Sequence, residues 1–247
     1  MGTMMRGNPL LCAAALIALL TAVAVACGGG GVEEPTVAPS PGATGVPTGA
    51  PTATPSAVEE QLRGMVLQPS DLPAGFSLAQ ESFSTNEEVA GDGEDAAEVL
   101  ARLTEWGRIL GHGVVFSSEA SSENSVFLVD STVSLYESDS GAAASFADAV
   151  NTARATDWQA SVGEATDLRV EEVPSLDVAD EMLWLRITGT ALVGDPPAEQ
   201  PFVQDVVLLR VGRVRGSVSI LTGAADVALL VESMVRTQAD NMAAGLQ

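Results

Sequence analysis

The feature that most limits the fold of this chain is a segment near the N-terminus that cannot belong to a globular core. Residues 28–56 read GGGGVEEPTVAPSPGATGVPTGAPTATPS, with seven Gly, six Pro and five Thr and no aromatic residue, Leu or Ile. Such a segment buries too little apolar surface to offset the entropy lost on ordering, so we expect residues 27–56 to form a disordered linker. A folded domain must then be built from residues 57–247.

The residues before the linker have the pattern of an export signal. Residues 1–26 combine Arg6 with an apolar run from Leu10 to Ala26 that ends in small residues, which is typical of a signal peptide. The run has 17 residues, the lower limit for crossing a bilayer, so a retained transmembrane anchor is the alternative.

Cys27 stands directly after this signal and is the only cysteine of the chain outside it. The sequence Val23-Ala24-Val25-Ala26-Cys27 resembles the lipobox of bacterial lipoproteins, with Ala24 in place of the usual Leu. Ala24-Val25-Ala26 also fits the A-x-A rule of ordinary secretion, and both patterns place the cut at the same bond. We expect lipidation of Cys27 and an exported protein anchored to the outer face of the cell membrane.

The composition of the chain excludes several classes of function. Acidic residues number 33 against 11 basic ones, a net charge of −22 that becomes −23 when Arg6 leaves with the signal. Nucleic acid is therefore excluded as a partner, and an anionic membrane surface is a poor one. All basic residues are Arg, which excludes Schiff-base, pyridoxal-phosphate and P-loop lysines. Residues 57–247 contain no Cys, so the domain has neither a disulfide nor a thiolate zinc site.

The hydrophobic pattern of residues 57–247 predicts a single α+β domain with an antiparallel sheet flanked by helices. We expect strands at 76–83, 112–118, 125–137, 167–173, 181–192, 202–210 and 213–221. We expect helices at 57–66, 87–110 and 139–157, and a last helix that begins near Thr222. The strand at 125–137 alternates between an apolar set and a polar set, Phe127, Val129, Val133 and Leu135 against Asp130, Thr132 and Ser134.

Four segments of the domain resemble those of uncharacterised lipoproteins from high-GC bacteria. They read LQPSDLPAGF, EWGRILGHGVVF, VSLYESDSGAAASFADAV and VGRVRGSVSILTG. The same order of elements resembles, more distantly, the extracellular sensor domains of mycobacterial Ser/Thr kinases and PsbP-like domains. The resemblance implies an antiparallel sheet flanked by helices, and it carries over no catalytic residue.

No motif of the domain indicates catalysis or metal binding. His112 is the single histidine, and its place between two glycines predicts a turn between a helix and a strand. The acidic GDGED at 91–95 lacks the ligand spacing of an EF-hand loop, so a solvated acidic face is expected over weak calcium binding. Paired carboxylates for glycoside hydrolysis remain an alternative among 33 acids. We expect no cofactor and no metal.

Three arginines form the concentrated positive charge of the domain. If Val211-Gly212 is a two-residue hairpin turn, Arg210 faces Arg213, and Arg215 shares their side of the sheet. The other side is then core: Val203, Val207, Leu209, Val214, Val218 and Ile220. Opposed like charges destabilise a strand pair, so we expect a negative group nearby. It is either a neighbouring Asp or Glu or an anionic ligand held by Arg210, Arg213 and Arg215.

These features predict a monomeric, non-enzymatic binding domain of the cell envelope. Its ligand or partner is a small molecule, a lipid or an envelope protein. The alternatives are a protein-interaction module without a small-molecule site and an undetected hydrolase. A cleft that joins His112 to two carboxylates would favour the hydrolase.

Overall fold

The structure is a computed structural model that describes residues 56–247, except 119–125, 163–164, 194–196 and 224–226. The expected signal peptide, Cys27 and the expected linker up to residue 55 lie outside the described residues.

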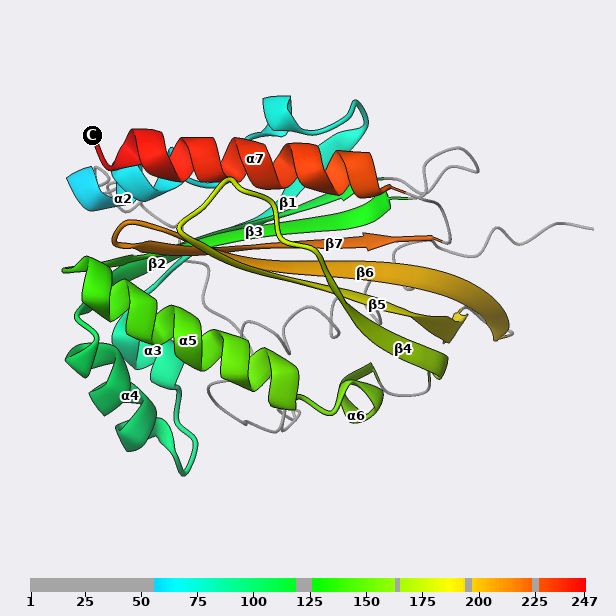
Figure 1. The fold of residues 1–247 in the computed structure, drawn as a ribbon, viewed down its shortest axis with the longest axis horizontal. Coiled ribbons are helices and arrows are strands. Elements are labelled where there is room, and N and C mark those ends of the chain that lie inside the picture. Colours follow the sequence, from blue (N-terminus) through cyan, green and yellow to red (C-terminus); the bar gives the residue numbers. More distant parts are fainter. Residues whose placement is uncertain (1–55, 119–125, 163–164, 194–196, 224–226) are drawn as a thin grey trace, which may run out of the picture.

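One antiparallel sheet of seven strands organises the domain (Figure 1). Its spatial order is β1-β2-β3-β7-β6-β5-β4, so the first three strands and the last four form two meanders that meet where β3 pairs with β7. The strands are β1 (Phe76–Ser84), β2 (Arg108–Ser118), β3 (Val126–Tyr136), β4 (Thr166–Val173), β5 (Glu181–Val193), β6 (Ala198–Val211) and β7 (Val214–Thr222).

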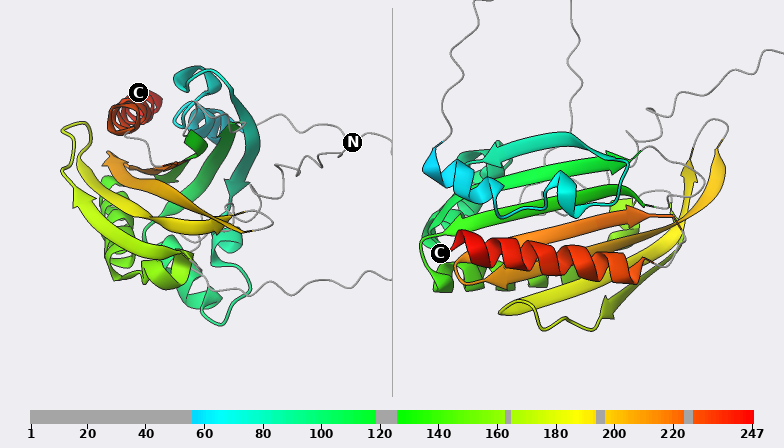
Figure 2. Two further views of the ribbon diagram at one scale, coloured as in Figure 1. Left: turned by 90° about the vertical axis from the view of Figure 1, so that its right-hand side faces the viewer. Right: turned by 90° about the horizontal axis from the view of Figure 1, so that it is seen from above.

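Helices cover both faces of the sheet, which confirms the expected α+β architecture. Figures 1 and 2 show α2 and α7 on one face and α3, α4, α5 and α6 on the other. The helices are α2 (Ala57–Arg63), η1 (Pro69–Asp71, a 3₁₀ turn), α3 (Asn86–Ala90), α4 (Ala96–Glu105), α5 (Asp139–Ala155), α6 (Trp158–Val162) and α7 (Ala228–Gly245).

Each face of the sheet has its own core. The face under α2 and α7 buries Phe116, Val129, Trp184, Val207 and Val218 against both helices. It includes the predicted core positions of β6 and β7 except the partly exposed Val203. The face under α5 and α6 buries a smaller group centred on β5 and β6, with Phe146, Trp158, Leu183, Leu185, Ile187, Val206 and Leu208.

The expected helix at 87–110 is wrong. Gly91 ends α3 at φ +65°, and Gly107 follows α4 at φ +66°, a backbone conformation that glycine adopts at little cost. The chain then enters β2 at Arg108, so residues 108–110 belong to a strand. The expected helix start near Thr222 is also wrong, because Thr222 is the buried last residue of β7 and α7 begins at Ala228.

The turn between β6 and β7 lies one residue later than expected. Val211 pairs with Val214, and Gly212 has φ +52° at the first turn position, so the turn residues are Gly212 and Arg213. Arg210 consequently faces Arg215, not Arg213. The partner of each residue therefore moves by two positions along the facing strand, and because side chains alternate with a period of two, the residues of both strands keep their predicted faces.

Candidate functional site

His112 lies in the middle of β2, and its side chain is 3% exposed. The expected turn position is wrong because β2 begins four residues earlier, at Arg108. Alternation along the strand turns His112 to the same side as Val114 and Phe116, the side packed against α2. Sequence reasoning missed this because the two flanking glycines resemble a turn.

Three side chains from α2 and β1 lie around the imidazole. His112 Nε2 is 3.1 Å from Glu81 Oε1, which also accepts a 2.8 Å hydrogen bond from Arg63 Nε. Phe83 stacks on the imidazole with ring centroids 4.4 Å apart, and the Arg63 guanidinium lies 4.9 Å from the centre of the Phe83 ring. The histidine ring is therefore fixed in position.

Burial lowers the pKa of His112 below its ordinary value of 6.5, although the hydrogen bond with Glu81 acts in the opposite direction. The hydrogen bond from Arg63 lowers the pKa of Glu81 below 4.5. At neutral pH the histidine is therefore neutral and the glutamate is ionised. Both ring nitrogens face an oxygen, Nε2 that of Glu81 and Nδ1 the backbone oxygen of Leu62 at 3.4 Å.

A hollow of about 130 Å³ opens beside this group. Its volume is below the 300 to 1,000 Å³ that is typical of small-molecule pockets. It contains one carboxylate and one imidazole, and none of its lining side chains carries a hydroxyl or a thiol, so it does not assemble a nucleophile, a base and an orienting acid. The lining residues are Arg63, Val66, Leu67, Gln68, Pro69, Leu78, Glu81, His112, Val114 and Phe116.

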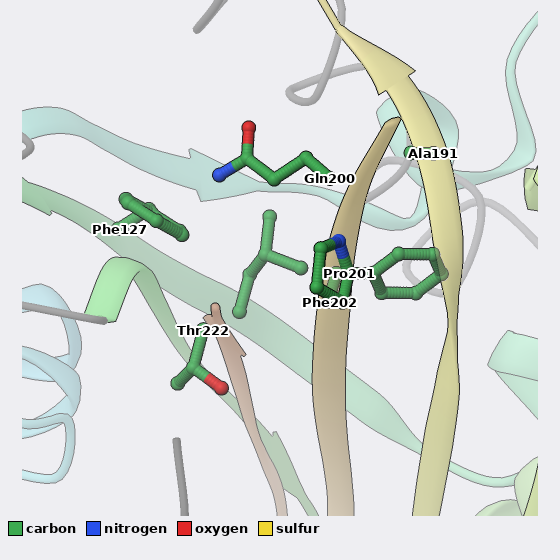
Figure 3. A pocket seen from close by; sticks show the side chains of 7 residues that line it. Phe127, Ala191, Gln200, Pro201, Phe202 and Thr222 are labelled. Atoms are coloured by element: carbon green, nitrogen blue, oxygen red, sulfur yellow. The ribbon is translucent and has the colours of Figure 1, made fainter. Parts of the chain in front are cut away.

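A second hollow lies near the hairpin end of β5 and β6 (Figure 3). Its volume of about 20 Å³ holds about one water molecule. Its walls are largely apolar: Phe127, Ala191, Gln200, Pro201, Phe202, Leu221 and Thr222.

Arg210, the first of the three predicted site residues, already has anionic partners. Its Nε donates to Glu181 Oε2, and its Nη1 lies 3.1 Å from Asp180 Oδ2. Glu181 faces Arg210 directly across β5 and β6. Neighbouring acids therefore compensate the positive charge of Arg210, which is the first of the two alternatives that the sequence predicted.

Arg213 and Arg215 have no carboxylate partner among the described residues. Arg213 Nη1 donates a 3.2 Å hydrogen bond to the backbone oxygen of Tyr136. Arg215 Nη1 donates to the backbone oxygen and the hydroxyl of Ser145 on α5, at 3.3 and 2.9 Å. Both guanidinium groups thus meet only neutral oxygens.

Arg108, which sequence reasoning missed, belongs to the same corner of the sheet. Its guanidinium donates to Ser84, Asn86 and Ser134 and to no carboxylate. Burial, together with the nearby positive charge of Arg215, lowers its pKa to about 10, although Tyr136 and Glu88 act in the opposite direction. The sequence pattern predicts a helix at residue 108, so it does not indicate this role for Arg108.

The register of the sheet explains why the arginines meet. One transverse row on the α5 side joins six facing residues, Ser84, Gly111, Ser134, Arg215, Arg210 and Glu181. Gly111 has no side chain, and the guanidinium of Arg108 occupies the space beside it in this row. An added Cβ at Gly111 would collide with Arg108 Nη2. We call Arg108, Arg213 and Arg215 the arginine corner.

The arginine corner retains hydrogen-bond donors for a further partner. Arg102 Nε is the only buried side-chain nitrogen or oxygen without a hydrogen-bond partner in the described part of the chain. The Nε and Nη2 groups of Arg213 and Arg215 have no hydrogen-bond partner among the described residues either. Guanidinium groups with free N–H donors match the oxygens of phosphate, sulfate and carboxylate.

The acidic segment GDGED connects α3 and α4 and is exposed. Among the described residues, no three His, Cys, Asp or Glu side chains are grouped so that they could hold a metal ion. In the same part of the chain, no helix is both long and apolar enough to cross a membrane.

Comparisons with known proteins give a likeness of fold. No family model matches the chain, and no curated protein sequence matches it. Among solved structures, the extracellular domain of PknH from Mycobacterium tuberculosis is similar, with 12% identity and a TM-score of 0.48, over 78% of this chain and 98% of that one. At this score and identity the likeness carries no conclusion about this chain.

Proposed function

We propose that this protein is an exported, non-catalytic binding domain that holds an anionic group at the arginine corner. The observation that supports the proposal is the set of hydrogen-bond partners that the arginines have. Among the described residues, the hydrogen-bond partners of Arg108, Arg213 and Arg215 are all neutral oxygens, in a chain that carries 33 acidic residues. Partly buried cations without a counter-charge are unfavourable, and an oxyanion would supply that charge through the free N–H groups.

The net charge of −22 makes the arginine corner a local exception. Long-range repulsion of anions is screened beyond about 8 Å at physiological ionic strength, whereas hydrogen-bonded contacts act below that distance. The corner therefore selects ligands with a compact anionic group, and not extended polyanions such as nucleic acid.

We propose in addition that the lipid on Cys27 holds the domain at the outer face of the membrane, at the end of the linker 27–56. The support is the sequence alone, since the only cysteine after the signal stands at the expected cleavage site. Several acyl chains on one residue give a stable anchor, because each buried methylene contributes roughly 0.8 kcal/mol.

The direct test is calorimetric titration of the full chain with inorganic phosphate. In the double variant Arg213→Gln with Arg215→Gln, we expect the affinity to fall at least about tenfold, because hydrogen bonds to charged groups contribute about 1.5–3 kcal/mol each. Arg154→Gln is the matched control, since Arg154 is half-exposed and pairs with Glu172 on the surface.

The control should change the affinity by less than about twofold. If the double variant binds phosphate as tightly as the unmodified chain, or if neither binds it, the anion-binding proposal is wrong. A loss of stability with unchanged phosphate binding would make the arginines structural.

A further inference from the structure

The α5 side of the sheet is polar next to the arginine corner, over strands β1, β2, β3 and β7. The register places two further rows of facing residues there, which lie two and four residues along each strand from the row of Arg215. The first row is Ser82, Gly113, Thr132 and Ser217, and the second is Gln80, Val115, Asp130 and Ser219.

The same two rows become apolar where they continue onto β6 and β5. The first row continues there with Leu208 and Leu183, and the second with Val206 and Leu185. All four side chains pack in the core under α5 and α6. A sheet face that packs against a helix carries large apolar side chains of this kind. In the other half the first row has only hydroxyls and glycine, and Ser82, Gly113, Thr132 and Ser217 are all at least partly exposed. The second row is mixed, since Val115 packs against the same core and Ser219 is buried beside Asp130.

Asp130 is the ionisable group of these two rows. No hydrogen bond or ion pair reaches its carboxylate from the described residues, and its oxygens contact solvent although the residue is half-buried. The hydroxyls of the neighbouring row, Thr132 and Ser217, bond to each other at 2.6 Å. Burial raises the pKa of Asp130 to about 7. A partly desolvated acceptor without a partner is unfavourable in a folded protein.

We propose that the arginine corner and Asp130 are the two ends of one surface that binds an anionic polyol, such as a phosphorylated sugar. The inference rests on the proposed function, because the arginines hold the anionic group. Asp130 then accepts hydrogen bonds from hydroxyls at the far end of the ligand, and the hydroxyls of Thr132 and Ser217 lie between.

The spacing of the two ends fits such a ligand. Asp130 and Ser134 are four residues apart on β3, which corresponds to about 13 Å between their Cα atoms. Arg108 and Arg215 flank Ser134 at the arginine end of this span. The carboxylate also repels a second anionic group, so the surface orients the ligand with its charge at the arginines.

The test compares glucose 6-phosphate, inorganic phosphate and glucose as probes, in calorimetric titrations of the full chain at pH 8. We expect glucose 6-phosphate to bind at least about tenfold more tightly than phosphate, since hydrogen bonds to a charged acceptor are strong. Asp130→Ala should abolish this difference and leave the phosphate affinity unchanged. Asp177→Asn, at an exposed position on the β4–β5 connection, is the control and should change neither affinity.

The outcomes separate this inference from the proposed function. If phosphate and glucose 6-phosphate bind equally, or if Asp130→Ala leaves the preference intact, the polyol inference is overturned and the anion site stands. If neither phosphate compound binds, both are overturned. Thermal unfolding of Asp130→Ala in the absence of ligand shows that a lost preference does not reflect unfolding.

The anionic polyol could come from a free sugar phosphate or from a lipid headgroup, and vesicles distinguish the two. We compare sedimentation of the chain with vesicles that contain phosphatidylinositol or phosphatidylcholine alone. Binding to phosphatidylinositol vesicles that Asp130→Ala weakens assigns a lipid headgroup. Binding to glucose 6-phosphate without binding to either vesicle assigns a soluble ligand.

Discussion

Arg210 on β6 and Arg215 on β7 face each other across the hairpin, yet their guanidinium groups have opposite surroundings. Arg210 contacts two carboxylates, from Asp180 and Glu181. Among the described residues, the Arg215 guanidinium donates hydrogen bonds to Ser145 on α5 and to no carboxylate. The three predicted site residues therefore differ in their surroundings: among the described residues, carboxylates balance the charge of Arg210 but not that of Arg215.

This division predicts the effect of Arg210→Gln. Removing the guanidinium breaks ion pairs with half-exposed acids but also relieves repulsion by Arg215, so we expect a loss of stability of about 1 kcal/mol or less in urea unfolding. Phosphate affinity should stay within about twofold, because Arg210 lies outside the arginine corner. A fall of tenfold or more would return Arg210 to the binding site.

Asp205 is the most deeply buried charged group of the sheet and should be sensitive to substitution. It is fully buried and accepts hydrogen bonds from Trp184 Nε1 at 2.6 Å and from Arg186 Nε at 2.9 Å. Asp205→Ala deprives both donors of this acceptor, and we expect a loss of about 3–5 kcal/mol in the free energy of unfolding. A loss below 1 kcal/mol, similar to that of an exposed pair, would contradict this role.

The pH dependence of stability should report Asp130. The pKa of this residue rises from 3.8 to about 7 on folding, so between these pH values the folded protein holds a proton that the unfolded chain has released. Its contribution to stability is fully present below pH 3.8 and is lost as the pH rises through 7.

Asp130→Asn removes this dependence. Since solvent reaches the carboxylate, we expect the variant to be more stable than the unmodified chain by about 1–2 kcal/mol at pH 8 and equally stable near pH 4. The measurement is urea unfolding of both proteins at the two pH values. An equal difference at both would show that the carboxyl group titrates normally.

Substitution of Cys27 tests the expected anchor. Cys27→Ser removes the lipid acceptor but leaves Ala24-Val25-Ala26 as a cleavage site, so the protein should appear in the medium. Fractionation of the producing cells checks this. If the variant stays in the membrane fraction after carbonate and high-salt washes, a retained transmembrane segment explains the localisation better than a lipid.

Local pattern was sufficient for most of the strands and for their faces. Alternation in β3 predicted that Phe127, Val129, Val133 and Leu135 enter one core while Asp130 and Thr132 point to the other side. The structure agrees except at Phe127, which lies at the bulge between Val126 and Leu128 and lines the small hollow instead. The pattern failed at α4 and β2, where helical periodicity continued past Gly107 into a strand. A glycine at positive φ ends a helix, but the sequence does not state which of several glycines does so.

The sequence by itself determined the α+β class, the cysteine-free and lysine-free chemistry of the domain, and the parity of each strand, because these depend on residue identity and on a period of two. Only the tertiary structure decided which residues meet. The pairing of β3 with β7 brings Ser134 beside Arg215, and the pairing of β2 with β3 brings Arg108 to the same place. Ser134 and Arg215 are 81 positions apart and Arg108 and Ser134 are 26 positions apart, and a pattern along the chain carries no information on which strands become neighbours.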